Sequence, residues 1–131
     1  MVNGNRNLNT TVVIVDTNAI IYAVKKRIDL KRSIPLELGN AVIYVPESVR
    51  RELRKLSRNS QDAKSALSYA ALFETVETTA DGDDGVIEAA IGRRSAILTN
   101  DRELISRSRA AGIGILTVRE GRKLELLHAP L

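Results

Sequence analysis

The sequence predicts an α/β fold of three layers, α/β/α, around a central, mainly parallel sheet. Short apolar runs rich in β-branched residues, which are typical of buried strands, alternate with segments whose apolar residues recur at helical spacing. Such an alternation is typical of parallel sheets that carry helices on their faces. We expect strands at residues 12–15, 42–45, 75–77, 96–99 and 113–118, and helices at 18–26, 46–57, 63–73, 83–94 and 101–110.

The remaining segments are less regular. Pro35 and Gly39 interrupt residues 28–40, so the sequence predicts a poorly defined stretch there. The pattern at residues 119–131 is ambiguous. Residues 1–10 are polar and rich in asparagine, which predicts a disordered tail before a single domain at 11–131.

The composition restricts the chemistry that this chain can perform. Its 131 residues contain no cysteine, which excludes disulfides, zinc–thiolate sites and thiol catalysis. The single histidine, His128, excludes a histidine-based zinc site or a hydrolytic triad built within one chain. Carboxylates must therefore carry any catalysis. The net charge of +4 is compatible with a polyanionic partner.

The sequence has no feature typical of membrane or secreted proteins. No apolar run approaches the length of a membrane span, and the start lacks the charged-then-apolar pattern of a signal peptide. We therefore expect a cytoplasmic protein that does not bind membranes.

Two acidic residues directly follow predicted strands. Asp16 comes after the run at 12–15, and Asp101 comes shortly after the run at 96–98. Ligands of open α/β sheets bind just beyond the carboxyl ends of the strands, so two acids at one such edge predict a metal. The alternative is that Thr17-Asn18 and Thr99-Asn100-Asp101 only cap the helices beside them, where polar side chains are favoured.

Helical phase adds a third acid, Glu52. Val49, Leu53 and Leu56 define the inward stripe of the helix at 46–57, and Glu52 lies on the flank of that stripe. The alternative is a solvated face on which Glu52 pairs with a neighbouring basic residue, which is the usual arrangement for a charge on a helix.

The pair Asp83-Asp84 opens another predicted helix. Asp83 is followed at i+3, i+4 and i+7 by Val86, Ile87 and Ala90, so it lies along the buried face, and Asp84 does not. Asp83 is therefore the better candidate for a site. The alternative is that both residues are N-terminal caps.

Taken together and in order, these acids resemble the four acidic motifs of the PIN-domain family of metal-dependent nucleases. The motifs are Asp16-Thr17-Asn18, Glu52 within Val-Pro-Glu-Ser-Val-Arg-Arg-Glu-Leu, Asp83-Asp84-Gly85-Val86-Ile87, and Thr99-Asn100-Asp101-Arg102-Glu103-Leu104. The resemblance covers roughly residues 12 to 118. The sequence departs from the family in having Gly85 where Ala is frequent, and the duplicated Asp leaves the third ligand open.

The resemblance implies a site of four carboxylates that holds Mg²⁺ or Mn²⁺. Crowded carboxylates repel one another unless a cation compensates their charge, and hard oxygen ligands select these two metals. The implied metal ligands are Asp16 and Asp101 directly and Asp83 or Asp84 directly or through water, with Glu52 as an outer ligand or as a group that orients water. Thr17, Asn18, Thr99 and Asn100 would hold the carboxylates in place.

The reaction implied by the resemblance is hydrolysis of RNA phosphodiesters that leaves a 5′-phosphate and a 3′-hydroxyl. Basic residues lie beside the acidic motifs, and those predicted to contact RNA, single-stranded or structured, are Arg50, Arg51, Arg54 and Arg102. The alternative for many of them is a solvated helix face. Since aromatic residues are few, we expect recognition of backbone and shape rather than extensive base stacking.

Two biological roles fit an endoribonuclease of this kind. The sequence at 115–126 is similar to archaeal stand-alone PIN proteins related to rRNA-processing endonucleases, which favours RNA processing and a ribosome-assembly partner. Toxin ribonucleases of toxin–antitoxin pairs share the length and the four motifs, so a toxin with an antitoxin partner is the alternative. The family resemblance and the small and apolar residues around the helix at 63–72 also predict a homodimer.

Two alternatives lie outside nuclease function. The chain could be a catalytically silent RNA-binding scaffold, but the complete set of acids argues against this. Asp16 could instead be a phosphoacceptor at a strand end. The early acidic pair of a receiver domain is absent, however, and position 18 lacks the acid of a haloacid-dehalogenase-type phosphatase.

Overall fold

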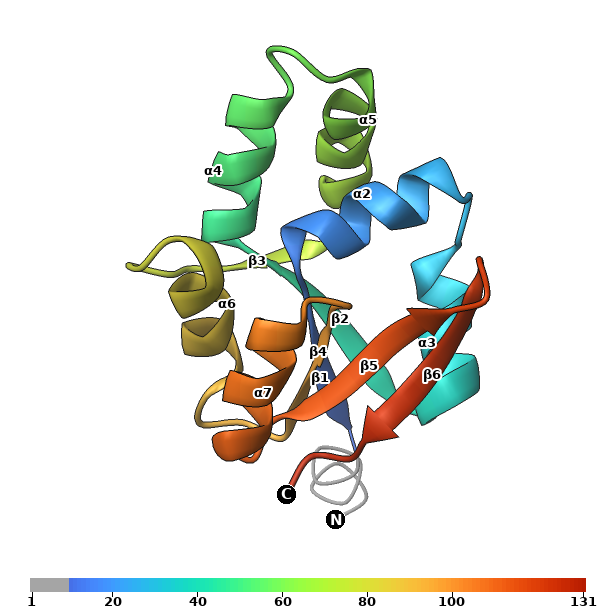
Figure 1. Cartoon of the computed structure of the whole chain (residues 1–131), viewed down its shortest axis with the longest axis vertical. Helices are drawn as coiled ribbons and strands as arrows, with labels where there is room; N and C mark the ends of the chain where they lie inside the picture. The colour runs from blue at the N-terminus through green and yellow to red at the C-terminus, as the bar shows by residue number, and fades with distance from the viewer. Residues whose placement is uncertain (1–9) are drawn as a thin grey trace.

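The computed structural model describes residues 10–131 and confirms the predicted three-layer α/β/α architecture (Figure 1). One six-stranded sheet has the order β3-β2-β1-β4-β5-β6, in which the first five strands are parallel and β6 is antiparallel to β5. The strands are β1 (Thr11–Val15), β2 (Ala41–Pro46), β3 (Glu74–Val76), β4 (Ser95–Leu98), β5 (Gly114–Arg119) and β6 (Lys123–His128).

Helices lie on both faces of the sheet. In Figure 1, α6 and α7 lie on one side, α3 lies on the other, and α2, α4 and α5 lie beyond the carboxyl ends of the central strands. The helices are α2 (Thr17–Lys25), α3 (Leu30–Leu38), α4 (Glu47–Leu56), α5 (Gln61–Ala70), α6 (Gly82–Ala90) and α7 (Arg102–Ala110). Among residues 10–131, none of these helices has the length and apolar character to cross a membrane.

The register of the two central strands decides where the first and last acidic motifs lie. Val15 of β1 pairs with Leu98 of β4. The chain then continues the pairing, because the Asp16 N–H donates to the Leu98 carbonyl at 3.2 Å. The residues that follow β1 and β4 are therefore neighbours, as expected for parallel strands that end at one edge.

The core is built on both faces of β1, β4 and β5. Side chains of these strands are fully buried, including Ile14, Ile97 and Leu116. Near-continuous burial of this kind is typical of parallel strands that are covered by helices on each side. Fully buried Ile20 of α2 and Leu104 of α7 join the same cluster, which fixes the helices that begin at the acidic motifs.

The stretch at 28–40, predicted to be poorly defined, instead contains the helix α3. Leu30 and Ile34, one helical turn apart, are fully buried, whereas Pro35 is exposed. The Tyr69 hydroxyl of α5 accepts a hydrogen bond from the N–H of Leu30 at 2.9 Å and so satisfies the start of the helix. Packing and this distant hydrogen bond outweigh the helix-breaking effect of the proline.

The ambiguous tail at 119–131 contains the last strand, β6. Glu120 and Gly121 both have positive φ, 43° and 82°, and turn the chain between β5 and β6. Arg119 pairs with Lys123 across this turn. Leu124 of β6 is buried, so the hairpin adds to the core.

Two predicted helices are shorter than their sequence patterns indicated. The helix at 63–73 ends at Ala70, and the helix at 83–94 ends at Ala90, after which Gly92 has a φ of 84° that favours glycine. Pro46 closes β2 and precedes α4 instead of opening the helix. The predicted tail at 1–10 lies outside the described residues except for Thr10, which is half-buried.

The apolar residues of α5, on which the dimer prediction partly rests, find partners within the chain. Ala63, Ala66 and Ala70 are fully buried, and Leu67 and Tyr69 are partly buried against the core. Because α5 packs between other helices of the same chain, its small residues reflect internal packing. Self-association therefore stays a prediction that rests on the family resemblance.

Candidate active site

Asp16 lies at the carboxyl end of β1 and is the most buried of the predicted site acids. The residue is 8% exposed, and its carboxylate accepts two hydrogen bonds, one per oxygen: the Thr17 N–H donates to Oδ1 at 2.8 Å, and Thr99 Oγ1 donates to Oδ2 at 2.9 Å. Thr99 Oγ1 in turn accepts from the N–H of Asp101 at 3.1 Å. Thr99 thus joins the first and the last acidic motifs.

Asp16 and Asp101 are both helix N-caps as well as neighbours at the sheet edge. Asp16 precedes α2, and Asp101 precedes α7 and accepts the Leu104 N–H on Oδ1 at 3.0 Å. The capping interpretation is therefore correct for the local geometry of these two acids. It does not replace the site interpretation, because the strand register brings both caps to one place.

Asp83 completes the group from the first turn of α6. The pKa of Asp16 is raised mainly by burial, and the charges of Asp83 and Asp101 raise it further. The pKa of Asp83 is also raised, mainly by burial and then by the charge of Asp101. Three elements distant in sequence thus deliver carboxylates that destabilise one another's charge.

Asp84 has a different environment from Asp83. Its side chain is 69% exposed, and its Oδ1 accepts from Arg107 Nη2 of α7 at 2.6 Å. Asp84 therefore links α6 to α7 at the surface. This arrangement agrees with the helical phase, which placed Asp83 and not Asp84 along the buried face.

Glu52 of α4 is joined to the first motif. Thr17 Oγ1 donates to Glu52 Oε1 at 2.7 Å. Arg51, one of the basic neighbours that the surface interpretation offered as a partner, instead pairs with Glu47 at 3.1 Å and with Asp81 at 2.8 Å. Glu52 therefore lies next to the acidic group, held there by the residue that follows Asp16.

The two asparagines of the motifs have separate environments. Asn100 pairs with the backbone of Val118 in β5: its Nδ2 donates to the carbonyl at 2.9 Å and its Oδ1 accepts the N–H at 2.9 Å. Its amide therefore fixes β5 rather than a carboxylate, which differs from the predicted arrangement. Asn18 is exposed and lines the pocket described below.

Arg50, predicted to contact RNA, faces the interior of the α4–α5 pair. Its Nη2 donates to the carbonyls of Ala70 at 2.9 Å and Phe73 at 2.8 Å, and burial lowers its pKa. Arg50 thereby holds α4 against the end of α5. By contrast, Arg54 and Arg102 are exposed.

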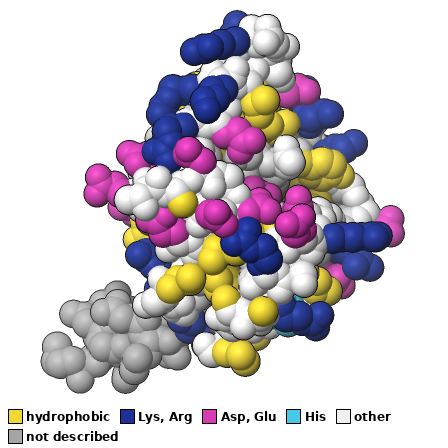
Figure 2. Space-filling model, turned by 60° about the vertical axis from the view of Figure 1, so that its left-hand side comes forward, with side chains coloured by type: hydrophobic (Ala, Val, Ile, Leu, Met, Phe, Trp, Pro, Cys, Tyr) yellow, Lys and Arg dark blue, Asp and Glu magenta, His cyan; other side chains and the backbone are white. Residues whose placement is uncertain are grey.

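The charges are separated on the face that carries α4 and α6. Figure 2 shows Asp and Glu side chains gathered in a band across the middle of this face, with Lys and Arg side chains over the protruding end of the molecule. The exposed basic residues on or just after α4 are Arg54, Lys55 and Arg58. A polyanion that approached the acidic band would meet these cations first.

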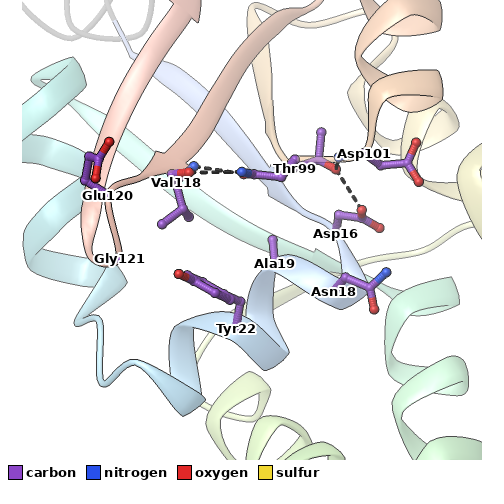
Figure 3. Close-up of a pocket in the computed structure, with 10 residues that line it drawn as sticks. Asp16, Asn18, Ala19, Tyr22, Thr99, Asp101, Val118, Glu120 and Gly121 are labelled. Atoms are coloured by element: carbon purple, nitrogen blue, oxygen red, sulfur yellow. Dashed lines mark hydrogen bonds between the residues drawn. The ribbon is translucent and has the colours of Figure 1, made fainter.

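A pocket of about 410 Å³ adjoins Asp16 and Asp101 (Figure 3). Sequence reasoning identified the polar side of this pocket and missed the rest, which comes from α2 and from the β5–β6 turn. The lining residues are Asp16, Asn18, Ala19, Tyr22, Thr99, Asn100, Asp101, Val118, Glu120 and Gly121. The Glu-Gly pair between two apolar alternating runs was a sequence signal for that turn.

The donor set fits a hard divalent cation. All candidate ligands are carboxylate oxygens. Burial, and then the charges of neighbouring acids, raise the pKa values of Asp16 and Asp83, and a cation would relieve the repulsion between these acids. Within residues 10–131 no three acidic or histidine side chains are already spaced as a complete set of metal ligands. Exposed Asp101 and half-buried Asp83 have room to adjust, whereas Asp16 is fixed.

Comparison with known proteins supports the resemblance to the PIN-domain family. The model of the PIN-like domain family matches residues 13–121. A curated relative, Ribonuclease VapC9 of Archaeoglobus fulgidus, is 32% identical over 124 residues, which cover 91% of each protein.

Solved structures extend the likeness to the whole fold. The PIN domain endonuclease Utp24 has a TM-score of 0.77 and 28% identity, with 91% of this chain and 92% of that chain covered. VapBC2 from Rickettsia felis, bound to a DNA fragment from its promoter, shares the fold alone, with a TM-score of 0.55, 18% identity, and 74% and 92% coverage. On the family match and the curated relative, this chain belongs to the PIN-like domain family.

Proposed function

We propose that this chain is a Mg²⁺- or Mn²⁺-dependent endoribonuclease. The observation that carries the proposal is the convergence of Asp16, Asp83 and Asp101 from three separate elements, with raised pKa values for Asp16 and Asp83. Carboxylates that are crowded in this way destabilise the fold, which is typical of functional sites. Compensation of their charge by a bound cation is the simplest explanation for the cluster. The names of VapC9, a ribonuclease, and Utp24, an endonuclease, support the same class of reaction.

In this proposal Asp16 and Asp101 bind the cation directly. Each carboxylate oxygen of Asp16 accepts one hydrogen bond from the protein, so the direction of the side chain is set before a ligand arrives. Asp83 is the third ligand, directly or through water. When bound, the cation would lower the pKa of a water and stabilise charge on the phosphate.

Glu52 has a positioning role. The Thr17 hydroxyl holds Oε1, which leaves Oε2 to accept a proton from a water or to orient it. The hydrolysis itself forms a bond between water oxygen and phosphorus, breaks the O3′–P bond, and leaves a 5′-phosphate and a 3′-hydroxyl. Helix N-termini at α2 and α7 add partial positive charge next to the substrate phosphate.

RNA is the proposed substrate, and its backbone would follow the basic residues of α4. Arg54 is exposed on that helix, and Arg102 is exposed at the start of α7. Arg51 adds charge at the same surface although it is paired with Asp81. We assign these residues to backbone contacts because they lie beside the acidic band and carry no fixed orientation toward a base.

For the biological role we favour RNA processing, with a toxin as the second candidate. The similarity of residues 115–126 to archaeal stand-alone PIN proteins related to rRNA-processing endonucleases favours processing, whereas toxin ribonucleases share the length and the four acidic motifs. The two roles differ in the partner, which is a ribosome-assembly component in one case and an antitoxin in the other. Affinity purification of the chain from its native cells separates them.

The test is cleavage of structured and single-stranded RNAs with Mn²⁺ or with EDTA, followed by mapping of the ends. We expect cleavage with Mn²⁺ only, 5′-phosphate and 3′-hydroxyl ends, and loss of cleavage in Asp101→Asn. Asp62→Asn, which changes an exposed acid of α5, is the matched control and should cleave normally. RNA binding without any cleavage by the unmodified protein would contradict the proposal and favour a silent scaffold.

A further inference from the structure

The pocket beside the acids has a size and lining that the hydrolysis of a phosphate does not require. Its volume of about 410 Å³ falls within the range of about 300 to 1,000 Å³ that is usual for small-molecule sites. Asp16 and Asp101 occupy one end, and Glu120 and Gly121 of the β5–β6 turn occupy the other (Figure 3). The pocket thus leads from Asp16 and Asp101 past Tyr22 and Val118 to the β5–β6 turn.

Tyr22 provides the aromatic surface of this region. It extends from α2, one helical turn after Asn18, and its ring lies across the pocket from Val118 (Figure 3). The ring is half-buried, and within residues 10–131 its hydroxyl makes no hydrogen bond. Nζ of Lys26, the residue that directly follows α2, lies 5.8 Å from the ring centroid. One flat face opposite an aliphatic wall is suited to a planar ligand.

The charges of the residues that line the pocket disfavour a phosphate in its interior. Asp16, Asp101 and Glu120 line it, and neither lysine nor arginine is among its lining residues. An uncharged planar group avoids that repulsion, whereas a phosphate would meet three carboxylates. A substrate fits this charge distribution if its phosphate lies beside Asp16 and Asp101, where a cation would bind, and an uncharged ring lies in the pocket.

We propose that this pocket binds one nucleobase of the RNA, adjacent to the phosphate that is cleaved, with Tyr22 as the stacking surface. The inference rests on the proposed function, because that function identifies the ligand as RNA. Stacking of unpaired bases on aromatic side chains is a general means of recognising single-stranded RNA. One stacked base is consistent with a chain that has few aromatic residues, since extensive stacking is not needed.

Glu120, an exposed residue at the far end of the pocket, would favour guanine if its carboxylate turns toward the base. An ionised carboxylate only accepts hydrogen bonds, so it favours a base edge with adjacent donors. Guanine has two adjacent donors, N1–H and the 2-amino group. Adenine and cytosine have one amino group next to an acceptor nitrogen, and uracil has its N3–H between two carbonyl oxygens that repel a carboxylate. The expected order is guanine, then adenine and cytosine, then uracil.

The test uses uncharged nucleosides, which probe the base without the phosphate. The full chain is titrated in EDTA with guanosine, adenosine, cytidine or uridine, and amide shifts of Ala19, Val118 and Gly121 are followed by NMR. We expect shifts confined to the pocket, with guanosine bound about tenfold more tightly than uridine. Tyr22→Leu, which retains packing volume, should weaken guanosine about tenfold, and Tyr22→Phe should retain it.

Two controls separate the pocket from general effects. Tyr44→Leu removes a partly buried tyrosine from β2, outside the pocket, and should leave guanosine binding unchanged. Glu120→Gln should reduce the preference for guanosine over uridine, whereas Glu77→Gln, an exposed acid outside the pocket, should not. Unchanged guanosine affinity in the Tyr22→Leu variant, or no shifts in the unmodified chain, would overturn the proposal.

Failure of this inference is distinguishable from failure of the proposed function. Metal-dependent cleavage without nucleoside binding would refute only the base pocket. Nucleoside binding at Tyr22 without any RNA cleavage would retain the pocket and refute the nuclease.

Discussion

Asp16 and Asp84 lie in one acidic region of the molecule but have opposite environments. Asp16 is 8% exposed, and each of its carboxylate oxygens accepts a hydrogen bond from the protein. Asp84 has a side chain that is 69% exposed and pairs with the guanidinium of Arg107. Asp83, next to Asp84 in sequence, resembles Asp16 in that burial and neighbouring acids raise its pKa.

The difference shows that the sheet edge and the start of α6 hold their acids by different means. At the edge, strand register and Thr99 determine where Asp16 and Asp101 lie. On α6, the packing of the helix determines that Asp83 faces the other acids. Substitutions at the sheet edge and at α6 should therefore have separate effects.

The largest effect is expected for Thr99→Val, which keeps the shape of the side chain. It removes the donor to Asp16 and the acceptor for the Asp101 N–H, so both ligands lose a support. Loss of such a support typically lowers metal affinity by about 10- to 100-fold. Calorimetric titration with Mn²⁺ measures this, with Thr117→Val of β5 as the matched control. Equal affinity in the two variants would show that Thr99 does not position the acids.

Gly85→Ala is expected to disturb the α6 half only. A Cβ at position 85 would lie 2.5 Å from the Ala80 carbonyl and 2.5 Å from Ser48 Oγ, so α6 must move away from α4. Overpacking of this kind costs about 1 to 3 kcal/mol of unfolding free energy. This also gives a physical reason for the departure from the alanine that is frequent in the family. Chemical denaturation measures the loss of unfolding free energy. Unchanged stability would contradict the prediction, because it would mean that α6 can move away from α4 without cost.

The pH dependence of stability should report the burial of Asp16 and its crowding by neighbouring acids. Its pKa in the fold lies above the ordinary 3.8, so the folded state binds protons more readily than the unfolded state. The stability that Asp16 contributes without metal is therefore complete below pH 3.8 and is lost as the pH rises through the raised pKa. Urea unfolding in EDTA should show this decline in Asp84→Asn and a smaller decline in Asp16→Asn. Parallel pH profiles for the two variants would exclude Asp16 as the source.

The smallest effect is expected for Arg107→Gln. The charge of Arg107 lowers the pKa of Asp83, so its removal should raise that pKa and shift the acid limb of Mn²⁺ binding to higher pH. Arg109→Gln, in the same helix turn, is the control and should leave the limb in place. A shift toward lower pH in Arg107→Gln would contradict the assignment.

The sequence predicted those parts of the site that depend on strands and helical phase. Asp16 and Asp101 follow buried strands, so their meeting at one edge followed from parallel pairing. Helical phase distinguished Asp83 from Asp84, because the packing of α6 determines which of its faces points inward.

The features of the fold and of the pocket that the sequence did not predict depend on contacts between distant residues. The helix α3 contains Pro35, and it is supported by Tyr69, 39 residues beyond the Leu30 N–H that it accepts. Arg50 has the sequence context of a surface charge, but its partners are carbonyls of α5. The apolar half of the pocket joins Tyr22 to the β5–β6 turn, and no local pattern brings these together.

The central claim is that Asp16, Asp83 and Asp101 form one metal site to which Asp84 does not belong. Calorimetric titration of Asp83→Asn and Asp84→Asn with Mn²⁺, at one pH and ionic strength, tests it directly because the two variants carry the same net charge. We expect Asp83→Asn to lose at least about tenfold in affinity, and Asp84→Asn to stay within about threefold of the unmodified protein. The opposite order, or equal losses in both variants, would contradict the account.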